Sequence, residues 1–198
     1  MYLKEETQHT LIIEKSRFLC YMKHLQSEQE FREYLAGIRK RHYDASHVCS
    51  AFLCHSLQRS SDDGEPAGTA GAPILNVLQK SGMDEMCAIV VRYFGGIKLG
   101  AGGLIRAYGS AVSECIKDGI LVEDMIYPRY ELTVSYETAN KLDHFLRNKT
   151  ILLDTEYDTE VTFTFALDQE EKLQNIIELT RGISPVQTGE EIVQKVVE

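Results

Sequence analysis

A stretch of twenty residues near the middle of the chain combines glycine and basic side chains in a pattern suited to holding an anion. The stretch is VVRYFGGIKLGAGGLIRAYG, residues 90–109. Glycine reaches positive φ without steric cost, and the first amides of a helix have no partner within the helix. We therefore predict an anion site, best suited to phosphate, formed by Arg92, Gly95, Gly96, Lys98, Gly100, Gly102, Gly103 and Arg106.

A second glycine-rich loop lies earlier in the chain, within QRSSDDGEPAGTAGAPILNVLQK, residues 58–80. Turn-forming residues fill its first half, which predicts a loop, and Pro73 suits the first turn of the helix that follows. The candidate ligand-binding residues of this loop are Gly68, Thr69 and Gly71. If the two loops converge, they form one anion pocket. If they do not, the glycines serve close packing and the charges pair with each other.

Three carboxylates, Asp62, Asp63 and Glu65, precede the glycines of this second loop. They are close enough in sequence to hold a hard cation such as Mg²⁺, or to accept hydrogen bonds from the loop amides. A solvated acidic turn is the simplest interpretation of the same residues. Mg²⁺ is the only cofactor that the sequence suggests.

A central strand is predicted over SHVCSAFLCH, residues 46–55. Alternation places His47, Cys49 and His55 on one face and Cys54 on the other. Cys49 and Cys54 then point apart, so the segment makes a poor zinc site despite its ligand types. His47 is a candidate ligand-binding residue, with a buried, hydrogen-bonded histidine as the alternative. No local signature supports a nucleophilic Cys/His pair.

The glycine stretch matches no standard nucleotide motif. Gly95 and Gly100 have the first spacing of a Walker A loop, but Ala101 and Gly102 stand where Lys and a hydroxyl residue are required. A GxGxxG fingerprint that starts at Gly100 has Ile105 in its last position. The GxSxG and HExxH motifs are absent from the chain. The sequence therefore favours a non-enzymatic role over an enzyme.

Hydrophobic periodicity predicts the elements that position the loops. A strand over residues 84–91 leads into the glycine stretch, and a helix from about Gly103 to Asp118 leaves it. Upstream of both loops we predict two strands, at residues 10–15 and 17–24, and a helix that starts with a capping box of Ser27 and Glu30. These elements form an N-terminal α/β domain.

The last third of the chain predicts the order βαββαβ of the ferredoxin-like arrangement. Its strands are expected at Tyr130–Val134, Ile151–Tyr157, Glu160–Leu167 and Val186–Val197. Pro128 and a shift in charge place the boundary, so the predicted domains are residues 1–128 and 129–198. The second domain contains no catalytic constellation, and recognition or dimerisation is its expected role.

The net charge of −9 is unevenly spread. Residues 1–128 carry 14 basic and 16 acidic side chains (−2), whereas residues 129–198 carry 7 and 14 (−7). Because acidic surfaces repel phosphate, any nucleic-acid contact requires a local patch on the first domain. No apolar run approaches the about 18 residues of a membrane span, and five dispersed cysteines suit a reducing compartment. We expect a cytoplasmic protein without membrane contact.

Two long motifs carry a resemblance to a known family. DDGEPAGTAGAPIL and VVRYFGGIKLGAGGLIRAYG closely resemble the signature of the IMPACT/YigZ family in its two-domain bacterial form. KSRF at residues 15–18 and the strand start from His47 to Cys49 also match the family pattern. The resemblance is densest over residues 44–109.

The resemblance implies an α+β fold of two α/β sandwich domains. The N-terminal domain would be similar to the second domain of ribosomal protein S five. The C-terminal domain would be ferredoxin-like, similar to modules of the ribosomal translocase elongation factor G. The family's eukaryotic member regulates translation initiation, but the domain that binds its partner is absent here, so that mechanism does not transfer.

Three functions are compatible with these residues. We expect a translation-associated regulator that binds RNA, the ribosome or a translation factor through the glycine-rich surface of the first domain. The alternative is a Mg²⁺-dependent enzyme or sensor for a small phosphorylated ligand that uses the same two loops. In the third interpretation, the protein is an assembly factor whose glycine loops only pack.

Overall fold

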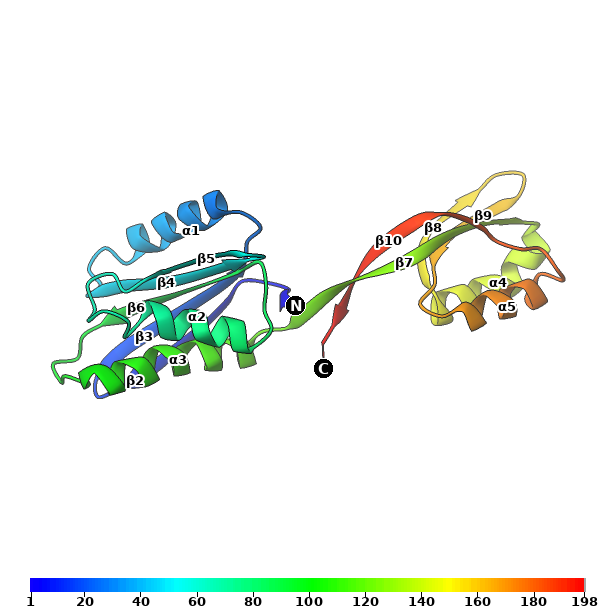
Figure 1. The fold of residues 1–198 in the computed structure, drawn as a ribbon. Coiled ribbons are helices and arrows are strands. Elements are labelled where there is room, and N and C mark those ends of the chain that lie inside the picture. The colour runs from blue at the N-terminus through cyan, green and yellow to red at the C-terminus, as the bar shows by residue number, and fades with distance from the viewer. Residues whose placement is uncertain (198) are drawn as a thin grey trace. The chain divides into compact units, whose positions relative to one another are not determined.

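The computed structural model describes residues 1–197, which form two compact units (Figure 1). The first unit comprises Met1–Glu123 together with the residues from Val196, and the second comprises Asp124–Lys195. Both units combine a sheet with helices, as expected for an α+β protein. No helix among the described residues is long and apolar enough to cross a membrane.

The first unit contains a five-stranded antiparallel sheet in the order β2-β3-β6-β4-β5. Its strands are β2 (Thr7–Ile13), β3 (Ser16–His24), β4 (His47–Cys54), β5 (Leu57–Ser61) and β6 (Met86–Tyr93). Its helices are α1 (Glu28–Arg41), α2 (Gly71–Lys80) and α3 (Gly100–Asp118). Figure 1 shows α2 and α3 on one face of the sheet and α1 on the other.

The side chains of β4 alternate between two hydrophobic clusters, which explains its almost continuous burial. Cys49, Ala51 and Leu53 pack beneath α2 and α3, whereas Phe52 and Cys54 pack beneath α1. Because helices cover both faces, the central strands are apolar along most of their length. The alternation predicted from the sequence is therefore confirmed for the residues within the strand.

One strand of the first unit lies where the sequence predicted a loop. β5 pairs with β4 at the sheet edge, and its residues Gln58, Arg59 and Ser60 are exposed. An edge strand with both faces polar has no hydrophobic alternation to reveal it. The true loop therefore begins after Ser61.

The second unit has the predicted order βαββαβ. Its elements are β7 (Leu121–Val134), α4 (Tyr136–Lys149), β8 (Ile151–Tyr157), β9 (Val161–Ala166), α5 (Glu170–Leu179) and β10 (Val186–Val196). β10 pairs with β7, β7 with β9, and β9 with β8, which is the ferredoxin-like arrangement. The start of β7 belongs to the first unit, where Leu121 pairs with Leu3 of the short strand β1 (Tyr2–Leu3).

Pro128, near which the sequence placed the domain boundary, lies within the continuous strand β7. Proline lacks an amide hydrogen but keeps its carbonyl, and Pro128 O accepts a hydrogen bond from Leu167 N at 3.2 Å. The two units divide between Glu123 and Asp124, a few residues before the proline.

Candidate anion-binding site

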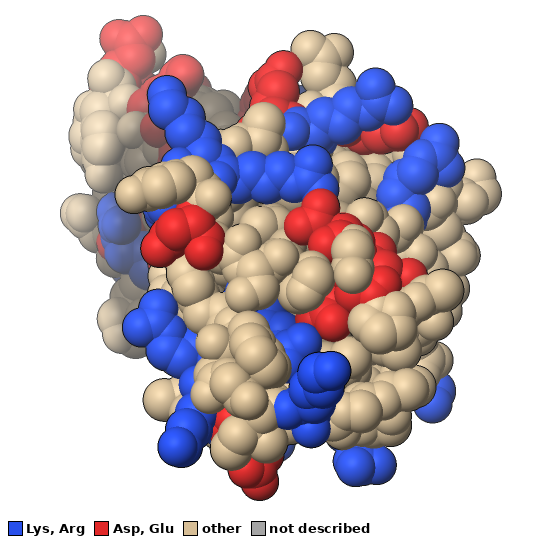
Figure 2. Space-filling model, turned by 90° about the vertical axis from the view of Figure 1, so that its left-hand side faces the viewer, with Lys and Arg blue, Asp and Glu red and all other residues tan. Residues whose placement is uncertain are grey.

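Both glycine loops lie at one end of the sheet in the first unit, where β4 begins and β6 ends. His47 and Arg92 are opposite each other in the β4–β6 ladder at this end. We call this end the loop face, and it comprises residues 14–17, 39–47, 61–70 and 92–106. Figure 2 looks onto it and shows Lys and Arg side chains in groups around the face, with Asp and Glu side chains between them.

Asp62 organises the first glycine loop. Its carboxylate accepts hydrogen bonds from the amides of Gly68 (2.8 Å), Ala70 (3.0 Å) and Gly71 (2.8 Å). Burial raises the pKa of Asp62, but the amides of Gly68, Gly71 and Ala70 together outweigh that effect and lower it below its ordinary value. Asp62 therefore serves as an internal anion that holds the loop at the start of α2.

Asp63 ties the same loop to β4 and α1. Its carboxylate accepts hydrogen bonds from Val48 N at 2.7 Å and from Arg39 at 2.8 Å, while its carbonyl oxygen accepts one from His47 Nδ1 at 2.8 Å. His47 is thus a partly buried, hydrogen-bonded histidine, which was the alternative weighed from the sequence. Its Nε2 lies 3.9 Å from a Glu65 oxygen.

Glu65 is the centre of a buried polar network. One of its oxygens accepts hydrogen bonds from Arg92 NH1 at 2.6 Å and from the Tyr108 hydroxyl at 2.8 Å. The side chains of Glu65 and Arg92 are only 3% and 6% exposed. Arg92 also approaches the rings of Phe18 and Phe94. The network joins the first loop to the end of β6 and to α3.

Cys49 belongs to this network through its thiol. Its sulfur lies 3.0 Å from the Asp62 carbonyl oxygen and 3.3 Å from the Tyr108 hydroxyl. Burial raises the pKa of Cys49 to about 12, so the thiol stays protonated at neutral pH.

The three carboxylates do not converge on a common point, because each is bound to different protein groups. Asp62 bonds loop amides, Asp63 bonds β4 and Arg39, and Glu65 bonds Arg92. Of the roles that the sequence left open, hydrogen bonding to the loop amides is observed for Asp62 alone, whereas Asp63 and Glu65 bond groups of β4, α1, β6 and α3.

A cavity of about 350 Å³ lies where the two glycine loops meet. It is lined by Glu65 and Pro66 from the first loop, by Arg92, Phe94, Lys98 and Leu99, and by Gly100, Ala101 and Leu104 of α3. The buried Nε of Arg92 has no hydrogen-bond partner within residues 1–197. No side chain caps the start of α3, whose first amides therefore lack a side-chain partner.

Other predicted residues lie around this cavity. Lys98 also lines a neighbouring hollow with Gly103 and Arg106, beside Glu14 of the β2–β3 turn. Gly68 lies in a third hollow, over α2. Thr69 is buried, and its hydroxyl donates to Pro66 O at 2.7 Å, so it stabilises the loop from inside.

The glycines of the two loops serve different purposes. A Cβ at Gly71 or Gly95 would lie within 3 Å of backbone atoms of a neighbouring segment, so these two permit close packing. Gly96 and Gly100 have φ of +90° and +68° and open space around them. At Gly102 a Cβ would meet only the end of the Arg106 side chain, at 3.6 Å. The stretch of residues 90–109 therefore contains both a glycine that permits close packing, Gly95, and glycines with open space around them, Gly96 and Gly100.

Sequence reasoning missed three residues in or beside the loop face. Tyr108 was not among the predicted site residues, although its hydroxyl donates to Glu65. Ser16 receives an amide hydrogen bond from Gly95 at 3.1 Å and lies 3.4 Å from Arg92. Phe94 is 48% exposed at the rim of the cavity. Only long-range contacts reveal these roles.

The fold and the site together define a two-unit α+β protein whose first unit has an open cavity, lined in part by Arg92 and Lys98, between the two loops. The sequence of residues 14–116 matches the protein family described as "Impact N-terminal domain", and this range includes every residue that lines the cavity. The chain belongs to the IMPACT family.

Individual relatives agree with this assignment. The chain is 41% identical over 195 residues to "IMPACT family member YvyE" of Bacillus subtilis, covering 95% of this chain and 90% of that protein. It is 37% identical over 139 residues to "IMPACT family member YigZ" of Escherichia coli, covering 68% of each. A crystal structure of a hypothetical protein, 28% identical, covers 100% of this chain and 96% of its own, with a TM-score of 0.60.

Proposed function

We propose that this protein is a translation-associated regulator that binds RNA, the ribosome or a translation factor through the loop face. The chemical group it recognises is a phosphate. The observation that carries the proposal is the cavity in which Arg92 and Lys98 meet the uncapped start of α3. A helix N-terminus and nearby cations are the usual elements of a phosphate site.

The charges around the cavity support a phosphate more than a metal ion. Arg92 forms an ion pair with Glu65, so the positive and negative charges of these two side chains nearly cancel. Lys98 then supplies the remaining positive charge of the cavity. The unpartnered Nε of Arg92 supplies a buried donor. Because Asp62 and Asp63 already bond protein groups, we leave Mg²⁺ out of the proposed site.

Exposed aromatic residues on the same face support RNA among the three partners. Tyr43 is 88% exposed and follows the basic end of α1, Arg39–Arg41. Phe94 is 48% exposed beside the cavity. Proteins that bind single-stranded nucleic acid combine cations that follow the backbone with aromatic rings on which bases stack.

Family membership supports the link to translation. The family resemblance seen in the sequence includes a eukaryotic regulator of translation initiation. The acidic second unit argues against binding through net charge, so the contact has to be local. Residues 1–128, which include Met1–Glu123 of the first unit, are close to neutral, with 14 basic and 16 acidic side chains.

Cosedimentation with ribosomes and gel-shift binding to single-stranded RNA at low salt test this function. We expect both to exceed the signal of an unrelated acidic protein, and the variants Lys98→Ala and Arg41→Ala to weaken them. Lys117→Ala is the matched control, because Lys117 lies at the other end of α3 and pairs with Glu114. Absence of both signals in the wild type would exclude the proposal.

A small phosphorylated ligand is the second candidate, and the size of the cavity favours it. About 350 Å³ lies within the range of small-molecule pockets, about 300–1,000 Å³. A thermal-shift screen of nucleotides and phosphorylated metabolites distinguishes the candidates. A stabilising compound whose effect is lost in Lys98→Ala, in a protein that binds no RNA, would favour the sensor.

A further inference from the structure

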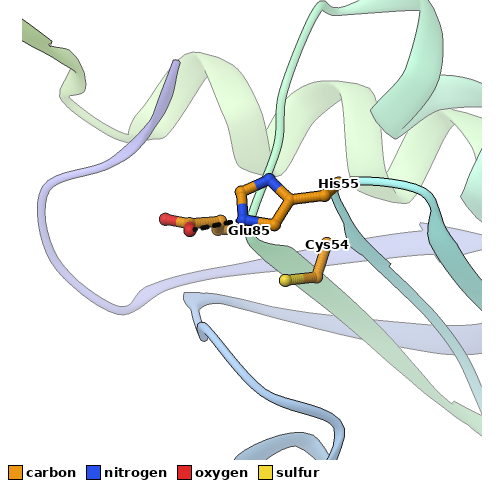
Figure 3. A group of neighbouring side chains, drawn as sticks. All are labelled: Cys54, His55 and Glu85. Atoms are coloured by element: carbon orange, nitrogen blue, oxygen red, sulfur yellow. Dashed lines mark ion pairs between the residues drawn. The ribbon is translucent and has the colours of Figure 1, made fainter.

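A second group of chemically active side chains lies at the opposite end of the same sheet, where β3 and β4 end and β6 begins. Figure 3 shows Cys54, His55 and Glu85 gathered there. One ligand atom from each of the three side chains lies within 4.8 Å of the other two. None of these residues contributes to the network on the loop face. We call this group the far-end cluster.

We propose that the far-end cluster is a site for a borderline transition-metal ion of the zinc class. His55 Nε2 and Glu85 Oε1 are 3.3 Å apart. Two ligands about 2.0–2.1 Å from one zinc ion in a tetrahedral site are separated by about 3.3–3.4 Å. The nitrogen and oxygen ligands therefore already have the required spacing, and the thiol is the third ligand.

Partners behind the ligands hold them in orientations that suit a metal. His55 Nδ1 lies 3.0 Å from Asp84 Oδ2, which leaves Nε2 directed to the cluster. The second oxygen of Glu85 lies 2.8 Å from His24 Nε2 and accepts from Gln26 Nε2 at 3.2 Å. A metal-binding histidine whose other nitrogen bonds a carboxylate, and a ligating carboxylate that is itself hydrogen-bonded, are regular features of metal centres.

The local backbone explains why the sequence did not predict this arrangement. Alternation within a strand would send Cys54 and His55 to opposite faces, but β4 ends at Cys54 and His55 adopts a φ of +52°. Histidine is among the residues that tolerate this left-handed conformation. Glu85 has a φ of +54°, and His55 N donates to Asp84 Oδ1 at 2.7 Å. The turn thus swings His55 back beside Cys54.

The types of ligand determine the class of metal. A thiolate, an imidazole and a carboxylate suit Zn²⁺ and Co²⁺ and are a poor set for Mg²⁺ or Ca²⁺, which prefer oxygen alone. Three protein ligands leave the fourth position of a tetrahedral ion to water. On binding, the Cys54 S–H bond breaks, the proton goes to solvent, and the sulfur electron pair forms the bond to the metal.

This loss of a proton makes the affinity dependent on pH. Burial raises the pKa of Cys54, as do the nearby carboxylates of Glu85, Asp84 and Glu30. The ligand atom His55 Nε2 must also carry no proton, because its lone pair forms the bond to the metal. Affinity for the metal is therefore expected to increase as the pH rises from 6 to 8, by way of proton release.

Titration of the full-length protein with Zn²⁺, and with Co²⁺ as a spectroscopic probe, tests the proposal. We expect one ion per chain and a near-ultraviolet absorption band from cobalt bound to thiolate. Cys54→Ser should abolish the band. His55→Ala should weaken binding by more than the about 10- to 100-fold that loss of an outer partner causes. The His55 side chain is 71% exposed, so this variant should fold normally.

His9→Ala is the matched control, because His9 pairs with Asp118 at 2.6 Å but has no thiol within that pair. It should bind Co²⁺ like the wild type. The proposal is overturned if the wild type gives no thiolate band, or if His55→Ala binds the metal as tightly as the wild type. Equal weakening by His9→Ala and His55→Ala would also overturn it, since it would indicate surface histidines.

Discussion

The two ends of the sheet in the first unit use ionisable side chains in opposite ways. β6 runs from Met86 to Tyr93, so the far-end cluster and the loop face are about 24 Å apart at the 3.4 Å rise of a strand. On the loop face, Glu65 and Arg92 are buried and paired. At the far end, His55 is exposed, and one ligand atom each of Cys54, His55 and Glu85 lies within 4.8 Å of the other two.

This difference in burial and pairing distinguishes ionisable side chains that stabilise the fold from those that can bind a ligand. Glu65 is 3% exposed, and one of its oxygens accepts from both Arg92 and Tyr108, so its main role is inside the fold. Lys98 and the start of α3 beside it retain capacity for a ligand, as does the far-end cluster. Substitutions can test whether a given residue stabilises the fold or binds a ligand.

The largest effect is expected from Arg92→Met, which removes the charge but keeps most of the volume. Glu65 would then remain buried without its cation, and breaking such a pair costs about 3–5 kcal/mol of the free energy of unfolding. Urea denaturation of the first unit measures this loss. Arg32→Met, in the exposed pair with Glu28, is the control and should change stability by less than about 1 kcal/mol. Equal small losses would mean that the Arg92 pair does not build the fold.

A smaller effect is expected from Asp62→Ala. Three amides, those of Gly68, Ala70 and Gly71, would lose their acceptor. Leaving buried donors unsatisfied costs about 1–3 kcal/mol. Thermal unfolding compared with wild type measures the loss. An unchanged midpoint would show that water replaces the carboxylate without cost and that Asp62 does not hold the loop.

The same contacts predict how stability depends on pH. Burial raises the pKa of Asp62, and the loop amides lower it further than burial raises it, so the folded-state pKa lies below the unfolded value. Its stabilising contribution is therefore present at neutral pH and is lost as the pH falls below about 5. Asp62→Asn should unfold with a shallower acid dependence than the wild type. Parallel stability curves for the two proteins would contradict the assignment.

Gly102→Ala should have the smallest effect on stability and should raise it. Gly102 lies in the first turn of α3, its φ is not positive, and a Cβ there meets only a flexible arginine. Replacing glycine in a helix gains about 0.5–1 kcal/mol. Gly71→Ala is the contrasting variant, because its Cβ would lie 2.7 Å from Ser61 N and should destabilise the protein. Destabilisation by Gly102→Ala would indicate that the entire glycine stretch only packs.

Much of the fold could be predicted from local patterns. Apolar alternation assigned the two faces of β4 as far as Cys54, and helical periodicity with turn residues gave the order βαββαβ of the second unit. Each of these signals depends on neighbours within about ten residues of one another. β5 escaped prediction because its polar edge position leaves no such signal.

The candidate site was predicted only in outline, because its geometry depends on contacts between distant segments. The sequence identified both glycine loops. It did not indicate that Glu65 would accept hydrogen bonds from Arg92 and Tyr108, which are 27 and 43 residues away. For Asp62 the sequence left open cation binding, hydrogen bonds to the loop amides and a solvated turn, and the bonds to the amides are seen only in the folded loop. At His55 a local feature decided the outcome instead. The strand pattern was correct as far as Cys54, but the left-handed conformation of His55 placed its side chain beside Cys54 and not on the opposite face.

The salt dependence of RNA binding by Lys98→Ala tests the central claim most directly. If Lys98 contacts a phosphate, the slope of log K against log salt should decrease in magnitude by about 0.7–1 relative to wild type, with unchanged thermal stability. Lys117→Ala, at the other end of α3, should leave the slope unchanged. Identical slopes for wild type and Lys98→Ala would contradict phosphate binding at the loop face.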